Sequence, residues 1–275
     1  MKAAGFDYLR PGEVAEAVAA LAKAAGGAKL LAGGQSLGPM LNLRLARPRL
    51  LIDVSRLQAL QQVEDTGRAW RIGAGVTHAR LEDARGKLPG GDMLCKVAAS
   101  IAYRSIRNRG TIGGSLAHAD PAADWPLALA ALGASVNIRG AGARVVSVER
   151  FIEGAFTTAL EDDEIIESID VPKLSRAGRY GFYKFCRRTG EFAEASAAAV
   201  FDPEAGAARI FLGALRGTPQ PLAALAQRVA AEGAAAASEQ AVTQSLTQAV
   251  GDLDAVERRM AAASVMRALQ QVFAP

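Results

Sequence analysis

The sequence predicts an α+β protein in two parts, and three observations support that prediction. Early in the chain, short apolar runs, glycine pairs and helical patterns alternate. Pro172 and the polar stretch 175–179 then interrupt the pattern, because proline ends a strand and the following residues offer little to bury. Beyond them, three short apolar runs precede an alanine-rich helical tail. The predicted ranges are 1–174 for the first part, subdivided at about 1–56 and 57–174, and 175–275 for the second.

The first part begins with a compact strand, turn and helix unit. A helix is predicted over 13–25, because Val14, Val18 and Leu21 recur at helical spacing and a glycine pair follows. The elements expected next are a strand over 29–32, a glycine turn, a helix starting at Ser36 and a strand over 49–54.

The middle of the chain mixes strands and short helices. Alternating residues predict a strand over 69–75, and Thr77 is placed to cap a helix around Leu81. The other elements expected here are helices over 93–100 and 125–132, a hairpin of 135–139 with 144–148, and a strand over 164–171.

The second part is predicted as a small sheet with helices. Its expected strands are 180–186, 193–201 and 207–215, and its helices begin at Leu222 and run to the C-terminus.

Composition excludes several classes of protein. Lys and Arg exceed Asp and Glu by only four, and no run of five like charges occurs, so no nucleic-acid partner is predicted. Cys95 and Cys186 lie far apart, and His78 and His118 are the only histidines, so neither zinc nor an iron–sulfur cluster can be assembled from this chain. The start has no signal-peptide pattern and no stretch of about twenty apolar residues follows. We therefore expect a cytoplasmic chain without a membrane span.

The first glycine motif, Ala32–Gly33–Gly34–Gln35–Ser36, lies between a predicted strand and a predicted helix. Paired glycines let successive backbone N–H groups turn inward and form an anion-binding nest at a helix start. A phosphate fits such a nest, although a glycine pair between a strand and a helix is more often a plain turn.

The second cluster runs from Arg107 to Ser115 and contains Thr111–Ile112–Gly113–Gly114–Ser115, with a hydroxyl on either side of the glycines. Two such loops can grip the two phosphates of a dinucleotide. The alternative is an unrelated tight turn, with Arg107 and Arg109 as solvated surface charges. Neither loop matches the Rossmann or P-loop pattern.

Asp120 and Asp124 follow the second cluster four residues apart, so on one helix they would share a face. Their carboxylates are candidates to accept hydrogen bonds from ribose hydroxyls, and helix capping is the alternative. Lys184, Arg187 and Arg188 lie beside aromatic residues, either on an exposed strand edge or facing an electron-rich cofactor.

Together these segments resemble the FAD-binding medium subunit of the molybdenum hydroxylases, the group that contains carbon monoxide dehydrogenase and xanthine dehydrogenase. The resemblance spans nearly the whole chain. Its residues are the two glycine motifs, Ala119–Asp120–Pro121 with Asp124, Glu164–Ile165–Ile166, and Lys184 with Arg187–Arg188.

The resemblance implies a two-subdomain FAD-binding domain of the vanillyl-alcohol-oxidase (PCMH) type, followed by a small C-terminal domain of sheet and helices. It implies that Asp124 holds the ribityl or ribose side, and that Ile166 and Lys184 lie near the isoalloxazine. Gln35 stands where some relatives have His, and Ser115 where many have Asn. The residues implied around the pyrophosphate are Lys29, Ala32, Gly33, Gly34, Gln35, Ser36, Thr111, Ile112, Gly113, Gly114 and Ser115.

The resemblance also implies partners. Substrate is hydroxylated at a molybdenum cofactor in a large subunit, and electrons pass through two [2Fe–2S] clusters of a small subunit to FAD, in a dimer of heterotrimers. No catalytic residue is assigned to this chain, which would pass the electrons to an external acceptor. Two alternatives are a free-standing flavin oxidase with its own substrate and a nucleotide-sensing module that lost the flavin.

Overall fold

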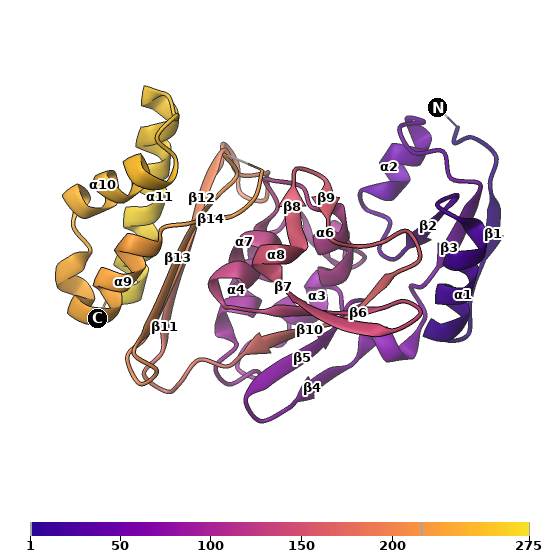
Figure 1. Ribbon diagram of the computed structural model, residues 1–275, viewed down its shortest axis with the longest axis horizontal. Helices are drawn as coiled ribbons and strands as arrows, with labels where there is room; N and C mark the ends of the chain where they lie inside the picture. Colours follow the sequence, from indigo (N-terminus) through magenta and orange to yellow (C-terminus); the bar gives the residue numbers. More distant parts are fainter. Residues whose placement is uncertain (1, 216, 275) are drawn as a thin grey trace.

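Parallel strands build the N-terminal end of the fold. The computed structural model describes residues 2–215 and 217–274. Its first sheet has the order β1 (Asp7–Leu9), β3 (Leu50–Asp53) and β2 (Ala28–Leu31), all parallel (Figure 1). Helix α1 (Val14–Ala24) buries Ala17 and Leu21 in the core on this sheet, and α2 (Leu37–Asn42) follows the first glycine motif. The elements predicted here are confirmed, whereas the three-residue strand β1 was not predicted.

An antiparallel sheet of five strands forms the centre. The predicted hairpin is confirmed by β6 (Ser135–Arg139) and β7 (Ala143–Ser147), and Pro172 is the last residue of its strand as expected. The order is β4 (Val63–Asp65), β5 (Ala69–Gly73), β10 (Ile165–Pro172), β6 (Ser135–Arg139) and β7 (Ala143–Ser147).

Helices cover one face of this central sheet. The helices are α3 (His78–Glu82), α4 (Asp92–Ser100), α5 (Arg104–Arg107), α6 (Ile112–His118) and α7 (Asp124–Ala131). The apolar residues of α3, α4, α6 and α7 share one core with Ile72, Val136 and Ile169 of the strands, whereas α5 has no buried residue. Shorter elements are η1 (Gln58–Gln61), α8 (Val148–Phe151), β8 (Ile152–Gly154) and β9 (Thr157–Thr158). The predicted helices of this region are confirmed, and Thr77 caps α3 by accepting from the N–H of Arg80.

The C-terminal part is a four-stranded antiparallel sheet with its own helices on one face and the first part of the chain on the other. The three predicted strands are confirmed as β11 (Arg179–Phe185), β12 (Ala195–Asp202) and β13 (Ala207–Gly213), and β14 (Gln220–Pro221) completes the sheet. The helical tail is α9 (Ala223–Glu232), η2 (Gly233–Ala236), α10 (Glu239–Ala249) and α11 (Ala255–Phe273). The predicted end of that tail, Pro275, lies outside the described residues.

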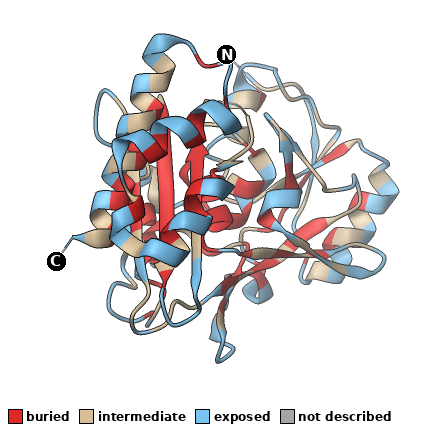
Figure 2. Cartoon of the chain, turned by 60° about the vertical axis from the view of Figure 1, so that its left-hand side comes forward, coloured by how far each residue is buried: buried red, intermediate tan, exposed pale blue. Residues whose placement is uncertain are grey.

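Strand β12 is buried on both faces between two cores, and half of its eight residues are alanines, whose small side chains permit close packing. Ala198 and Val200 face the core of the first part, whereas Ala197 and Ala199 face α9–α11. In Figure 2 the strands of this sheet are largely buried, and the helices in front of them expose their outer sides. One apolar core therefore crosses the predicted boundary at 174/175, and the division into domains stays a prediction.

Gly181 lets β11 lie close to α11, which makes it a test of this packing. A Cβ at Gly181 would lie 1.9 Å from the carbonyl oxygen of Ala268. Gly181→Ala is therefore expected to lower the free energy of unfolding by about 1–3 kcal/mol, the usual range for overpacking. Gly142→Ala is the control, because a Cβ there has no atom within 4 Å. Urea unfolding measures both, and equal stability of the two variants would contradict the expectation.

Candidate functional site

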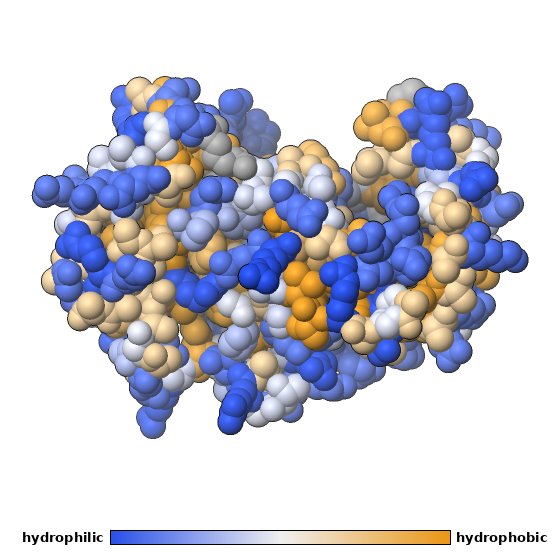
Figure 3. Space-filling model, in the orientation of Figure 1, coloured by the Kyte–Doolittle hydropathy of each residue, from blue (hydrophilic) through white to orange (hydrophobic). Residues whose placement is uncertain are grey.

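The structure brings the two glycine motifs into contact. The first glycine loop (32–36) leaves the carboxyl end of β2, and the second glycine loop (107–115) runs from the end of α5 through the first turn of α6. A Cβ at Gly33 would lie 2.1 Å from the carbonyl oxygen of Arg109 and 2.8 Å from the Cα of Gly110. Gly33 is thus what lets the two loops approach each other, and the shared phosphate grip stays a prediction. In Figure 3 the surface is hollowed between the α2 end of the molecule and its centre.

The first glycine loop offers free hydrogen-bond donors. No residue in the described part of the chain accepts a hydrogen bond from the backbone N–H of Gly33, Gly34, Gln35 or Ser36. Gly34 has a positive φ of 70°, which favours glycine. Successive N–H groups that have no acceptor among the described residues are what an anion-binding nest requires, and the nest itself stays a prediction.

The second glycine loop uses its N–H groups differently. The N–H of Ile112 donates to Val76 O, that of Gly113 to Ala74 O, and that of Gly114 to the hydroxyl oxygen of Thr111. The N–H of Ser115 donates to Thr111 O. This loop therefore has few free N–H donors, and its Thr111 side chain is buried while Ser115 is half-buried. The predicted ligand contacts of both loops stay predictions.

Arg107 is a structural residue, so the surface-charge alternative is wrong for it. Its side chain is 11% exposed and pairs with Glu82 at 2.8 Å. It also donates to Ile101 O and Ala102 O. These bonds hold the turn between α4 and α5, directly before the glycines. Arg109 is exposed, as that alternative supposed.

The expectation that Asp120 and Asp124 share a helix face is wrong. Helix α6 ends at His118, its C-cap Ala119 has a φ of 49°, and Asp120 accepts from the N–H of Ala122 in the turn that follows. Asp124 is the first residue of α7, and Ala123 is the N-cap. Neither Asp120 nor Asp124 is a helix N-cap, so the capping alternative is wrong for both.

Asp124 forms a buried ion pair across the predicted boundary. Its Oδ2 accepts from Lys184 Nζ at 2.8 Å, and the two side chains are 6% and 8% exposed. Lys184 also donates to Ser100 O at the end of α4. The other carboxylate oxygen, Oδ1, is buried without a partner among the described residues. Burial raises the pKa of Asp124 to about 6, although Lys184 opposes that shift.

Lys29 and Ile166 lie on strands beside the loops. Lys29 is exposed on β2, three residues before the first glycine loop. Ile166 is buried on β10 within the helix-covered core. The backbone links β10 to the second glycine loop, because Ala74 bonds both Glu167 O and the N–H of Gly113.

Sequence reasoning missed His78 as a residue of this site. His78 is 6% exposed, and its backbone N–H donates to Gly110 O. Its Nδ1 accepts from Trp125 Nε1 at 3.1 Å. The sequence around His78 gives no sign of these contacts, because Gly110 and Trp125 are distant from it in the chain.

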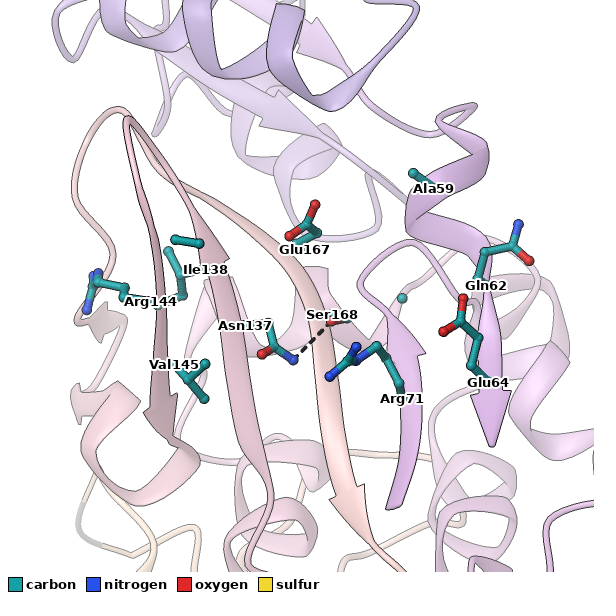
Figure 4. A pocket seen from close by; sticks show the side chains of 12 residues that line it. Ala59, Gln62, Glu64, Arg71, Asn137, Ile138, Arg144, Val145, Glu167 and Ser168 are labelled. Carbon is teal, nitrogen blue, oxygen red and sulfur yellow. Dashed lines mark hydrogen bonds between the residues drawn. The ribbon is translucent and has the colours of Figure 1, made fainter. Parts of the chain in front are cut away.

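Two hollows of about 400 and 440 Å³ lie away from the glycine loops. The first is on the open face of the central sheet, where Asn137 donates to Ser168 and Arg71 lies near Glu64 (Figure 4). Most of its charges are already paired, as Arg71 is with Asp170. The second lies beside Lys173 and Tyr180 at the predicted boundary.

Within residues 2–215 and 217–274, no three His, Cys, Asp or Glu side chains gather as a metal site. The same ranges contain no helix with the length and apolar character needed to cross a bilayer.

Comparisons with known proteins agree with this geometry. A family model described as "FAD binding domain in molybdopterin dehydrogenase" matches residues 4–174. Caffeine dehydrogenase subunit beta of Pseudomonas sp. (strain CBB1) is 37% identical over 235 residues, or 82% of this chain and 79% of that one. The carbon monoxide dehydrogenase medium chain of Hydrogenophaga pseudoflava is 38% identical over 199 residues, covering 71% and 68%. A chain of quinoline 2-oxidoreductase from Pseudomonas putida 86 superposes with a TM-score of 0.90 at 31% identity, covering 99% of this chain and 98% of that one.

Proposed function

The chain belongs to the FAD-binding medium subunits of the molybdenum hydroxylases, and from that premise we propose that it passes electrons from iron–sulfur clusters of a partner to an external acceptor. It is an oxidoreductase subunit whose cofactor is FAD, and such complexes contain large and small partner subunits. When bound, FAD supplies the ability to accept and release electrons. The chain's own task is to bind, orient and shield that cofactor.

One observation carries the proposal: the first glycine loop offers four successive N–H groups that no described residue accepts from, and the second glycine loop packs against it. In our proposal these N–H groups hold the pyrophosphate of FAD, with Lys29 nearby as a countercharge. The hydroxyls of Thr111 and Ser115 complete the grip. A hydroxyl that accepts one hydrogen bond, as that of Thr111 does, still has a proton to donate.

The buried Asp124 supports a second contact. Its Oδ1 has lost water and has no partner among the described residues, which is unfavourable for a carboxylate. A ribityl or ribose hydroxyl of FAD would donate to this oxygen and remove the penalty. Asp120, in the preceding turn, is the second candidate to accept from such a hydroxyl. Lys184 would then lie near the flavin ring, and Ile166 behind it in the core.

The proposed partners carry the remaining chemistry. A large subunit would hold the molybdenum cofactor and hydroxylate the substrate, and a small subunit would hold two [2Fe–2S] clusters. We propose a dimer of such heterotrimers. Electrons would enter at the flavin from the small subunit, so this chain would contact that subunit closely.

The test is purification of the native complex through this chain, with FAD, iron and molybdenum quantified in the same eluate. We expect roughly one FAD with about four iron and about one molybdenum per chain. Adding substrate should bleach the flavin absorbance, and an electron acceptor should restore it. FAD without metals would instead support a free-standing flavoprotein, and absence of FAD would refute the proposed site.

A further inference from the structure

We propose that His78 is a positioning residue that fixes the second glycine loop against the first turn of α7, and thereby sets the distance between that loop and Asp124. The inference rests on the proposed role of both in holding FAD. It concerns a residue that would itself make no contact with the cofactor.

The second glycine loop rests directly on His78. The backbone N–H of His78 donates to Gly110 O at 2.9 Å. A Cβ at Gly110 would lie 2.8 Å from both Cδ2 and Nε2 of the imidazole, so the loop backbone is in contact with the ring. Thr77, the residue before His78, forms an isolated antiparallel bridge with Thr111. The loop therefore has both backbone and ring contacts with one short segment.

The same imidazole holds the start of α7. Its Nδ1 accepts from Trp125 Nε1 at 3.1 Å, and Trp125 is fully buried. Every residue of α7 is buried, so this helix has little freedom to shift. Trp125 follows Asp124 directly in the chain. The side chain of His78 thus connects the second glycine loop to Trp125, the residue next to Asp124.

The chemistry of the pair requires a neutral imidazole. An indole N–H can only donate, so Nδ1 of His78 must carry a lone pair and the ring proton must lie on Nε2. Burial, together with the positive charge of Arg107, lowers the pKa of His78 to about 4. At neutral pH the ring therefore stays uncharged, and Nδ1 keeps the lone pair that accepts from Trp125 Nε1.

The test compares variants that keep or remove the acceptor. His78→Asn keeps an amide oxygen near the position of Nδ1, whereas His78→Leu leaves the buried N–H of Trp125 unsatisfied. We expect His78→Leu to raise the FAD dissociation constant about tenfold or more, and His78→Asn to stay within about threefold. FAD fluorescence quenching measures the affinity, and thermal unfolding of the FAD-free chain measures stability. A purely structural role would lower the unfolding temperature of both variants and leave the dissociation constant of the folded chain unchanged, which would overturn the proposal.

A second measurement does not depend on the variants folding. NMR of the parent chain with ¹⁵N-labelled histidine should show His78 neutral at about pH 7, with its proton on Nε2 and the Trp125 indole N–H hydrogen-bonded. A charged ring, or a proton on Nδ1, would overturn the inference. Because this measurement needs no FAD, it is separable from the proposed function, which fails if the parent chain binds no FAD.

Discussion

Gly33→Ala is expected to remove most of the affinity for FAD. The added Cβ would lie 2.1 Å from the carbonyl oxygen of Arg109 and 2.7 Å from its carbon, so one glycine loop must move by about 1 Å to reach an ordinary contact. Overpacking of this kind costs about 1–3 kcal/mol, which corresponds to about five- to 150-fold in a binding constant. The movement would separate the N–H groups of the first glycine loop from the second glycine loop.

Gly38→Ala is the matched control for Gly33→Ala. Gly38 lies in α2, five residues further along, and a Cβ there has no atom within 4 Å. Alanine suits a helix better than glycine by about 0.5–1 kcal/mol, so this variant should fold at least as well as the parent. Titration with FAD, followed by flavin fluorescence, compares the three chains. The proposed phosphate grip is wrong if Gly33→Ala binds FAD within about twofold of the Gly38→Ala control.

Local sequence predicted the elements around this site because their signals are local. The apolar run of β2, the glycines after it and the helix start at Ser36 all lie within a few residues. Strand β1 was not predicted, because its three residues are too few to show an alternating pattern. Its place in the sheet depends on pairing with β3, more than forty residues away.

The contacts that build the site could not be predicted, because they join distant residues. Gly33 meets Arg109, and Lys184 reaches Asp124, only once the sheets are packed. The spacing of Asp120 and Asp124 misled for a physical reason. Ala119 ends one helix in the left-handed conformation, so a turn separates the two carboxylates that a continuous helix would have aligned. Only the resemblance to a family implied that the two glycine motifs line one pyrophosphate.

Lys184→Met is expected to lower the free energy of unfolding by about 3–5 kcal/mol near pH 8, because it leaves Asp124 buried without a countercharge. Both side chains of this pair are less than a tenth exposed. The matched control is Arg228→Met, which breaks an exposed pair with Glu232 at 3.5 Å and should cost about 0.5 kcal/mol or less. Urea unfolding of both variants at several pH values provides the measurement.

The pH dependence of that loss identifies its cause. The pKa of Asp124 in the folded chain is already raised to about 6 from 3.8, so the folded state binds a proton that the unfolded state lacks between those values. The stability that Asp124 contributes therefore falls as pH rises through that window. Without Lys184 the pKa of Asp124 in the folded chain rises further, so the window extends to higher pH. The difference in the free energy of unfolding between Lys184→Met and the parent should therefore grow above about pH 6 and be smallest below about pH 4. Adding Asp124→Asn to Lys184→Met should abolish this increase above about pH 6, because no ionisable group is then left in the pair.

A loss of stability that is the same at about pH 5 and about pH 8 would contradict the expectation. It would mean that Lys184 acts through its packing between the two parts of the chain and not through its charge.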